Sequence, residues 1–441
     1  MKMPPELTQK RIFKFWSPLA LTWLMMSVEG PLIAAIIARM PEAIYNLGAY
    51  GIAFSIGLII EAPIIMIMSA STALTTDIVS FRKLRVVTYT LNLLLTIGMF
   101  FVLIPVVFDL ITISLLNLPI ELRDLTYSAT ILLLPWPAAI GYRRFYQGIL
   151  IRYERTRLVT YGTVIRLSTM VTTAIAGYSI GSLSGAEVGT LALSVGVIFE
   201  AIASRIMANP VIKQLKADNE ANEILSYRDI INFYFPLALT SVISLAVHPM
   251  VTFFVSGGKN AIESLAVLPV INSFIFIFRS LGLSFQEAAI ALLNEDLSGF
   301  RPLLKFFMRL GLFLIFSLIL ITNTPLMEYW FIYIADLPRE LITFAWLPTR
   351  ILAIIPFLSL LISFQRAILV NGRQSSPISY ASVVEVSVIA ILMWLTIYQW
   401  NFIGATGAAI AIIIGRIFSN AYLMKECKPY ILTGISKQNH A

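Results

Sequence analysis

The sequence predicts an all-α, multi-pass membrane protein in which twelve transmembrane helices form two six-helix lobes. Of its 441 residues, 58% are hydrophobic and only 13% are charged, and the mean hydropathy is +0.84. Soluble proteins are about 45–50% apolar and about 25% charged, so most of this surface is expected to face lipid. The apolar residues gather in segments long enough to cross a bilayer, and the second half of the chain repeats the first.

The repeat is clearest at the start of each half. Residues 15–22 read Phe-Trp-Ser-Pro-Leu-Ala-Leu-Thr, and residues 233–240 read Phe-Tyr-Phe-Pro-Leu-Ala-Leu-Thr. One short match could arise by chance, whereas a series in register indicates a duplicated chain whose function lies where the halves meet. Further pairs at an offset of 218 or 219 residues are Pro31 with Pro249, Leu47 with Leu265, Gln147 with Gln365, and Gly185 with Gly404.

The apolar segments define the predicted spans, because a bilayer core of roughly 30 Å needs about 20 apolar residues per helix. The N-lobe is predicted at residues 1–207, a polar cytoplasmic linker at 208–229, and the C-lobe at 230–441. The first half gives spans at 13–38, 47–70, 85–107, 121–147, 158–180 and 186–207. The second half gives spans at 230–256, 263–292, 303–324, 339–369, 377–399 and 403–423.

The basic residues predict the orientation. Most of the 32 Lys and Arg residues lie in the two tails or beside even-numbered loops, and cytoplasmic loops carry an excess of these residues. Both termini are therefore predicted to be cytoplasmic, in the inner (plasma) membrane. The net charge of +8 belongs to this topology and not to nucleic-acid binding. Six spans per half give both lobes the same orientation, so their pseudo-twofold axis runs along the membrane normal.

Several classes of chemistry are excluded by composition. Cys427 is the single cysteine, which excludes an internal disulfide framework and a Cys-based metal cluster. Two histidines leave no zinc motif, and no Gly-rich phosphate loop is present for ATP-driven pumping. We therefore expect no enzymatic activity, no metal site and no cofactor.

Charged residues at membrane depth are costly, so they usually face a cavity or each other. The repeat register makes Glu61 the counterpart of Arg279, which predicts acids on one wall of a shared cavity and bases on the other. Arg166 and Glu385 are counterparts with the opposite signs, and we expect them to pair within a helix or between lobes. The acidic candidates of the first half are Glu29, Glu61 and Glu200, and the basic candidates of the second half are His248, Arg279, Arg350 and Arg416.

These residue types indicate an anion site and a coupling-ion site. A guanidinium stays charged and holds carboxylate or phosphate with two parallel hydrogen bonds. A carboxyl group in a low-dielectric site can exchange a proton near neutral pH. The alternatives are a salt bridge between Glu61 and Arg279 that only closes one face, and a buried, hydrogen-bonded His248. Arg143, Arg144 and Arg366 are expected to reach lipid headgroups from cytoplasmic helix ends, and the alternative is an entry funnel for anions.

Prolines occur at equivalent places in the first span of each half. They are Pro18 and Pro31, with counterparts Pro236 and Pro249. Proline removes a backbone hydrogen bond and kinks a helix, and such kinks are common in membrane helices. The four prolines are either packing kinks or hinges for alternating access.

Several of these motifs resemble the progressive ankylosis (ANK) family of membrane transporters. Residues 15–22, followed by Leu47-x-x-Tyr50-Gly51-x-Ala53-x-Ser55, resemble its opening spans. The second half adds Phe254-Val255-Ser256, Pro348-x-Arg350-Ile351 with Pro356, and Gly404-Ala405-Thr406. The family looks related to the multidrug/oligosaccharidyl-lipid/polysaccharide (MOP) exporters, which include the multidrug MATE transporters. The resemblance implies two six-helix lobes in a V and export of citrate, ATP or pyrophosphate-linked anions. Arg350 falls in a matching motif, whereas Glu29 is offset by about one residue from the family's acidic position.

The sequence thus predicts a monomeric secondary transporter that exports small organic or phosphate-containing anions by alternating access. Arg279, Arg350, His248 and Arg416 would bind the anion, and Glu29, Glu61 and Glu200 would couple transport to a proton or sodium ion. The alternatives are a MATE-type antiporter of cationic drugs, a flippase for lipid-linked saccharides, and a membrane receptor or scaffold without transport activity. A 12-span major facilitator shares the six-plus-six design, but its basic loop motif is not matched by residues 76–83.

Overall fold

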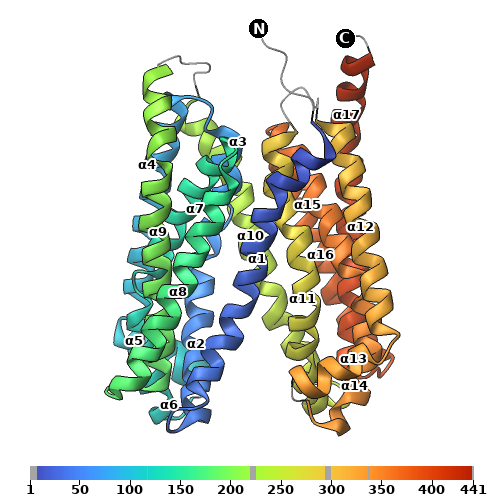
Figure 1. Cartoon of the computed structure of the whole chain (residues 1–441). Helices are drawn as coiled ribbons and strands as arrows, with labels where there is room; N and C mark the ends of the chain where they lie inside the picture. The colour runs from blue at the N-terminus through green and yellow to red at the C-terminus, as the bar shows by residue number, and fades with distance from the viewer. Residues whose placement is uncertain (1–6, 117, 219–224, 294–298, 336, 440–441) are drawn as a thin grey trace. The chain divides into compact units, whose positions relative to one another are not determined.

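The computed structural model describes residues 7–116, 118–218, 225–293, 299–335 and 337–439, and all regular elements in these ranges are helical (Figure 1). Within the described residues, eleven helical stretches are long and apolar enough to cross a membrane, and two of them, Ala43–Leu74 and Arg339–Asn371, each combine two helices. The all-α, multi-pass fold class is therefore confirmed.

The helices of the first half are α1 (Gln9–Ile37), α2 (Ala43–Glu61), α3 (Ile67–Leu74), α4 (Ile78–Val102), α5 (Pro105–Asp109), α6 (Ile120–Leu132), α7 (Trp136–Arg152), α8 (Thr156–Ile180) and α9 (Gly185–Asp218). The second half contains α10 (Tyr227–Ser256), α11 (Ala261–Leu292), α12 (Phe300–Thr322), α13 (Leu326–Tyr329), α14 (Arg339–Leu352), α15 (Ile355–Asn371), α16 (Ser376–Trp394) and α17 (Gly404–Asn439).

The helix boundaries repeat as the sequence does. α6, α7 and α9 begin 219 positions before α14, α15 and α17. Each half also contains a π-helical turn at the same stage, Leu110–Leu115 in the first and Trp330–Ile334 in the second. The duplication therefore extends from the sequence to the start of individual helices.

The predicted fourth span, residues 121–147, is the only one outside the eleven apolar helices. It consists of two shorter helices, α6 and α7, and α7 carries Arg143 and Arg144 within its length. Its counterpart in the second half, residues 339–371, also contains two helices. Together these two helices are long and apolar enough to cross a membrane. The predicted linker is partly helical, because α9 continues through Pro210 to Asp218.

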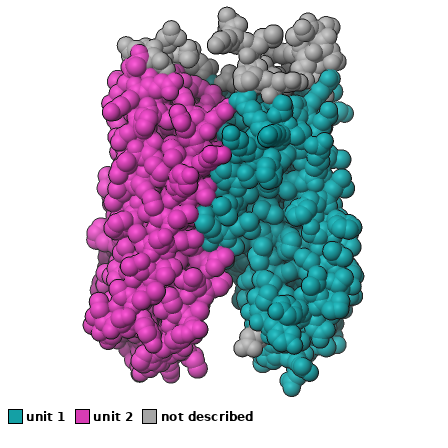
Figure 2. All heavy atoms as spheres, in the orientation of Figure 1, with its two compact units in different colours: residues 1–27, 242–441 teal, residues 28–241 magenta. Residues whose placement is uncertain are grey.

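The chain forms two compact units, shown in different colours in Figure 2. Unit 1 is Met1–Ser27 with Val242–Ala441, and unit 2 is Val28–Ser241. α1 and α10 each pass from one unit to the other. This division differs from the predicted lobes, because hydropathy marks where a helix crosses the membrane and not which bundle each of its ends packs against.

Hydrogen bonds hold the first part of each of these two helices to its unit. In unit 1, Trp16 Nε1 on α1 donates to Ser284 Oγ on α11 at 2.9 Å. In unit 2, the Tyr234 hydroxyl on α10 donates to the Pro63 carbonyl at 2.6 Å. Because Trp16 and Tyr234 belong to the repeated opening motif, the same motif anchors both exchanged segments.

A proline makes the second span differ between the halves. α2 ends at Glu61, and a short 3₁₀ turn containing Pro63 separates it from α3. Proline lacks the N–H that would continue the α-helix. α11 has Leu281 at the equivalent position and runs unbroken to Leu292. The break therefore leaves Glu61 at the end of its helix, beside the start of α7.

Within unit 2, α3 and α7 pack with their backbones in close contact. A Cβ atom at Gly148 would lie 2.6 Å from the Met68 carbonyl oxygen. Ser71 Oγ donates to the Phe145 carbonyl at 2.8 Å, and Thr72 Oγ1 donates to the Gly148 carbonyl at 3.3 Å. Small residues at helix contacts permit this approach in membrane proteins. The contact fixes α7, which carries several of the buried charges.

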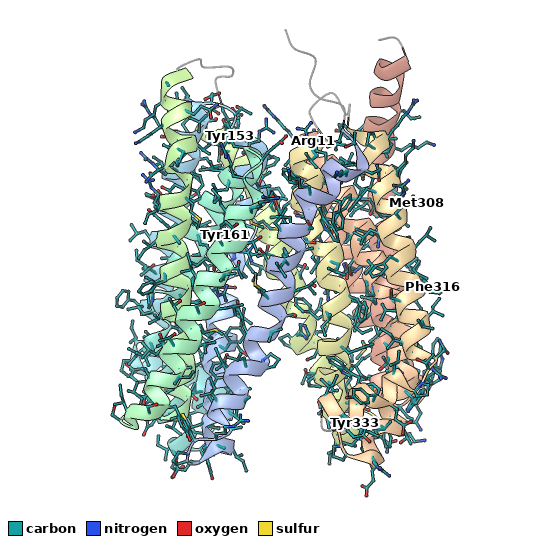
Figure 3. All side chains as sticks on the ribbon, viewed as in Figure 1. Arg11, Tyr153, Tyr161, Met308, Phe316 and Tyr333 are labelled. Carbon is teal, nitrogen blue, oxygen red and sulfur yellow. The ribbon has the colours of Figure 1, made fainter. Side chains whose placement is uncertain are left out.

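The outer surface of unit 1 is apolar along α12. Met308 and Phe316 point away from the bundle (Figure 3), and both are exposed. The opposite side of α12 is buried, with Leu310, Leu314 and Leu318 in the core. A helix that is apolar on both its exposed and its buried sides is typical of a lipid-facing span.

Candidate functional site

Each unit contains a cluster of charged side chains, fully buried in unit 2 and partly buried in unit 1. In unit 2 the cluster, which we call the acid–arginine network, consists of Glu29 on α1, Arg143 on α7, Arg166 on α8 and Glu200 on α9. All four side chains are buried. Since the four residues come from four helices, their positions depend on the packing of the whole unit.

Glu200 lies at the centre of this network. Its Oε2 atom is 2.6 Å from Arg143 Nη1 and 3.7 Å from Arg166 Nη1. Its Oε1 atom accepts hydrogen bonds from Gln147 Nε2 at 2.9 Å and from Thr163 Oγ1 at 3.1 Å. Both carboxylate oxygens are thus satisfied, as a buried charge requires. This arrangement favours an anchoring role for Glu200 over the coupling role that the sequence predicted.

Glu29 is held on one side only. Its Oε2 atom is 2.5 Å from Arg166 Nη2, while its Oε1 atom has no hydrogen-bond partner among the described residues. Tyr50 on α2 interacts with it electrostatically. An unsatisfied buried carboxylate oxygen is unusual and calls for a reason such as ion binding. Glu29 therefore has one buried carboxylate oxygen that no described residue satisfies.

Glu61 accepts a hydrogen bond from Trp136 Nε1 at 2.5 Å. The guanidinium of Arg166 lies over the Trp136 ring, 5.6 Å from its centroid. Arg144 is the charged group with the strongest electrostatic effect on Glu61. Trp136 therefore links Glu61 to the acid–arginine network.

The predicted acidic wall is wrong for unit 2. Its three buried acids are matched by Arg143, Arg144 and Arg166 from α7 and α8. Arg143 is only 2% exposed, so it does not reach a lipid headgroup as expected. Arg166 pairs between helices of one unit, and not within a helix or between lobes. The sequence analysis missed these arginine partners because it compared residues at equivalent positions of the two halves. Residues that pair inside one bundle do not occupy equivalent positions of the repeat.

In unit 1 the charged groups are mostly basic. The arginine cluster consists of Arg279 on α11, Arg366 on α15 and Arg416 on α17, and Glu385 on α16 is the acid beside it. Arg416 Nη2 lies 2.8 Å from Glu385 Oε1. Arg366 Nη2 donates to Ser382 Oγ at 3.4 Å, a long and weak hydrogen bond. Three guanidinium groups against one carboxylate leave a surplus of two positive charges.

Arg279 has no hydrogen-bond or ion-pair partner among the described residues, and its Nε atom is buried. It interacts electrostatically with Arg416, Glu385 and Arg366. Guanidinium groups held near one another without enough acids are typical of an anion site. The sequence predicted Arg279 and Arg416 for this role but assigned Arg366 to the membrane surface.

The other two predicted anion ligands, His248 and Arg350, have different surroundings from each other. His248 on α10 is exposed and interacts electrostatically with Arg279. Arg350 on α14 is exposed, its guanidinium lies 4.7 Å from the Trp346 ring centroid, and its Nε donates to the Thr322 carbonyl at 3.1 Å. Thr322 ends α12, so Arg350 satisfies a carbonyl at a helix C-terminus. This contact gives Arg350 a structural role, and its role in anion binding stays a prediction.

The four prolines lie on either side of the points where α1 and α10 change units. The change occurs after Ser27 in α1, between Pro18 and Pro31, and after Ser241 in α10, between Pro236 and Pro249. Both helices remain continuous through their prolines.

A threonine side chain hydrogen-bonds to the first proline of each pair. Thr22 Oγ1 donates to the Pro18 carbonyl at 3.1 Å, and Thr240 Oγ1 donates to the Pro236 carbonyl at 2.9 Å. Such side-chain hydrogen bonds often bend helices. The repeated motif thus places a proline and this side-chain hydrogen bond in each helix that passes from one unit to the other.

Comparison with solved structures defines the fold. An outward-facing multidrug resistance MATE family transporter of the MOP superfamily is similar over 96% of both chains, with a TM-score of 0.73 and 14% identity. A MOP superfamily transporter from Pyrococcus furiosus gives a TM-score of 0.74 and 14% identity over 97% of this chain and 96% of that one. The chain has the MATE transporter fold. A eukaryotic MATE transporter shares it with a TM-score of 0.74 and 11% identity over 98% of this chain and 99% of that one.

The MATE fold consists of twelve transmembrane helices in two lobes, as the sequence predicted. No protein-family model matches the chain, and no curated protein matches it either. Among the described residues, no group of three or more His, Cys, Asp or Glu side chains could hold a metal ion. The charged clusters described above are therefore the candidate sites within this MATE fold.

Proposed function

We propose that the protein is a secondary active transporter that exports small organic or phosphate-containing anions by alternating access. The observation that supports this most is the arginine cluster of unit 1, where three guanidinium groups face one carboxylate. Citrate-like, pyrophosphate-like and nucleotide-like anions carry the carboxylate or phosphate groups that guanidinium recognises. The resemblance to the ANK family also favours an anionic substrate.

One of the similar structures supports the idea that the MATE fold can serve other substrates. The Pyrococcus furiosus MOP transporter is described as having a binding pocket of reverse polarity, which suggests a different function. In the present chain the buried acids of unit 2 are neutralised, and the surplus charge of unit 1 is positive. Both features disfavour a cationic substrate, because a cation would be repelled by Arg279.

A MATE-type antiporter of cationic drugs is the second candidate. It is favoured by the free Oε1 atom of Glu29 and by Glu61, for which one hydrogen bond is seen among the described residues. In the main proposal these two acids couple transport to a proton or sodium ion. A flippase for lipid-linked saccharides is a third candidate, and it would also use cationic side chains.

Exchange in proteoliposomes tests the proposal. Purified protein is reconstituted, loaded with unlabelled anion, and supplied outside with radiolabelled citrate, pyrophosphate or ATP. We expect saturable counterflow of at least one anion and no counterflow of the lipophilic cation tetraphenylphosphonium. Counterflow of the cation alone would select the antiporter, and liposomes without protein provide the background.

Glu61→Gln is expected to remove the dependence of transport on an imposed pH or sodium gradient, with anion counterflow in the absence of a gradient preserved. The amide keeps the shape of the side chain but cannot exchange a proton or balance a cation. The measurement compares initial rates with and without each gradient. Glu121→Gln, an exposed acid at the start of α6, is the matched control. A gradient dependence that persists in Glu61→Gln would remove Glu61 from the coupling site.

The double variant Pro18→Ala/Pro236→Ala is expected to slow anion exchange by about 30-fold. Each alanine restores a backbone hydrogen bond worth roughly 1 kcal/mol, which stiffens a helix that joins the two units. The measurement compares the exchange rate with the anion dissociation constant, which is expected to stay unchanged. Pro105→Ala, at the exposed start of α5, is the control. An unchanged exchange rate would favour simple packing kinks.

We also propose that the protein is a monomer in the plasma membrane with both termini in the cytoplasm. The distribution of Lys and Arg residues supports this orientation.

A further inference from the structure

We infer that Glu385 is a resident counter-anion that makes the arginine cluster selective for dianions. This inference rests on the proposed function and assigns the charge class of its substrate. Three facts carry it: Glu385 is bound to Arg416, two arginines remain available beside that pair, and the helix packing prevents the pair from separating easily.

The packing of α16 on α17 fixes the Glu385–Arg416 pair. A Cβ atom at Gly415, the residue before Arg416, would lie 3.0 Å from the Glu385 carbonyl oxygen and 2.5 Å from Ile389 Cγ1. The two backbones are therefore in close contact. Both side chains are mostly buried, with exposed fractions of 13% for Arg416 and 9% for Glu385. A pair held in this way commits Arg416 to Glu385.

The other two arginines lack such a partner. Among the described residues, Arg366 has only the long hydrogen bond to Ser382, one turn before Glu385 on α16. Arg279 has no hydrogen-bond partner among the described residues. Both side chains are partly buried, with buried Nε atoms; leaving such guanidinium groups unpaired is costly, and a ligand with two negative charges would satisfy both.

The charge balance then selects the ligand. A dianion neutralises the surplus left by three arginines and Glu385. A monoanion leaves one positive charge buried, and a trianion places an extra negative charge beside Glu385, which repels it. The fitting class is a small dianion that carries carboxylate or phosphate groups, which among the anions proposed above means the partly protonated, dianionic forms of citrate and pyrophosphate. His248 also interacts electrostatically with Arg279.

The position equivalent to Glu385 in the first half of the chain also forms ion pairs, but its residue carries the opposite charge. Arg166 is the counterpart of Glu385 in the repeat, and it holds Glu29 and Glu200 of unit 2. The acid–arginine network of unit 2 therefore has equal numbers of positive and negative groups. The arginine cluster of unit 1 and Glu385 together have two positive charges in excess. The same helix position therefore sets the net charge of each cluster.

The test uses the purified full-length protein and three carboxylates built on one three-carbon skeleton. Butyrate, glutarate and tricarballylate carry one, two and three charges at pH 8, and inorganic phosphate serves as a second dianion. Isothermal titration calorimetry gives each dissociation constant. For the unmodified protein we expect glutarate and phosphate to bind about tenfold more tightly than the other two anions.

Glu385→Gln is the informative variant. This variant releases Arg416 and raises the excess of positive charges to three. The affinity for tricarballylate is therefore expected to increase about tenfold, which would make it the preferred ligand. Glu385→Gln/Arg416→Gln removes both charges of the pair, keeps the surplus at two, and is expected to restore the preference for glutarate. The double variant also covers the case in which the single variant does not fold. Glu340→Gln, an exposed acid on α14, is the control.

The outcomes separate the two proposals. If the unmodified protein binds none of these anions, the anion site itself is wrong. If it binds them but the order of affinity is the same in the variants, Glu385 does not set the charge preference and the anion proposal stands without it. A restored preference in the double variant is the result that a purely structural role of Glu385 does not predict.

Discussion

Replacing Arg166 with alanine is expected to lower the free energy of unfolding by about 3–5 kcal/mol, because it removes one partner of a buried ion pair. Arg166 holds Glu29 at 2.5 Å and lies 3.7 Å from Glu200. Without it, Glu29 remains buried with no counter-charge at hydrogen-bond distance among the described residues. Such a loss is a large part of the stability of an ordinary domain. Reversible unfolding in mixed micelles, followed by circular dichroism, measures it.

Two further variants test whether the loss of stability comes from the buried ion pair. Arg157→Ala, on the exposed start of α8, is expected to change the unfolding free energy by less than about 0.5 kcal/mol. Glu29→Gln combined with Arg166→Leu removes both charges of the pair and is expected to recover much of the loss, since Glu200 keeps Arg143 at 2.6 Å. A double variant no more stable than Arg166→Ala would show that the ion pair is not the source of the effect.

Arg279→Ala is expected to reduce anion counterflow by about 100-fold or more. Truncating one partner of a buried, charged hydrogen bond costs roughly 2–5 kcal/mol, and about 1.4 kcal/mol corresponds to a factor of ten. Arg279→Lys keeps the charge but loses the planar fork of donors, so an intermediate rate is expected. The measurement is the initial rate in proteoliposomes containing equal amounts of folded protein.

Two other cations of unit 1 serve as comparisons. Lys305 is exposed on α12, and Lys305→Ala should transport normally. Arg350→Ala tests the ligand role that the sequence predicted for Arg350, which the structure finds at the end of α12. A loss of stability with normal anion affinity would assign Arg350 to structure alone. If Arg279→Ala transports at the normal rate, the arginine cluster is not the substrate site.

Helix positions could be predicted well because they depend on local properties. The offset of 219 residues between repeated motifs returns as the offset between the starts of α6 and α14 and of α9 and α17. The predicted span at 158–180 is close to the observed α8, Thr156–Ile180. Hydropathy suffices here, since a membrane helix satisfies its own backbone hydrogen bonds.

The composition of the two charged clusters was predicted only in part. Glu29, Glu61 and Glu200 were found because acids are rare in apolar spans, and Arg279 and Arg416 were found for the same reason. Arg143 and Arg366 were placed at the membrane surface, because they lie near the ends of predicted spans. Inside the bundle, they face partners on other helices, Glu200 for Arg143 and Ser382 for Arg366.

The sequence by itself determined the all-helical fold class, the duplicated six-plus-six organisation and the presence of isolated charges in apolar spans. These depend on composition and on spacing along the chain. Only the tertiary structure decided that the buried acids of unit 2 are neutralised by arginines of α7 and α8, and that unit 1 keeps an excess of guanidinium groups. The reason is physical: the energy of a buried charge is set by neighbours within a few ångströms, which come from helices distant in sequence.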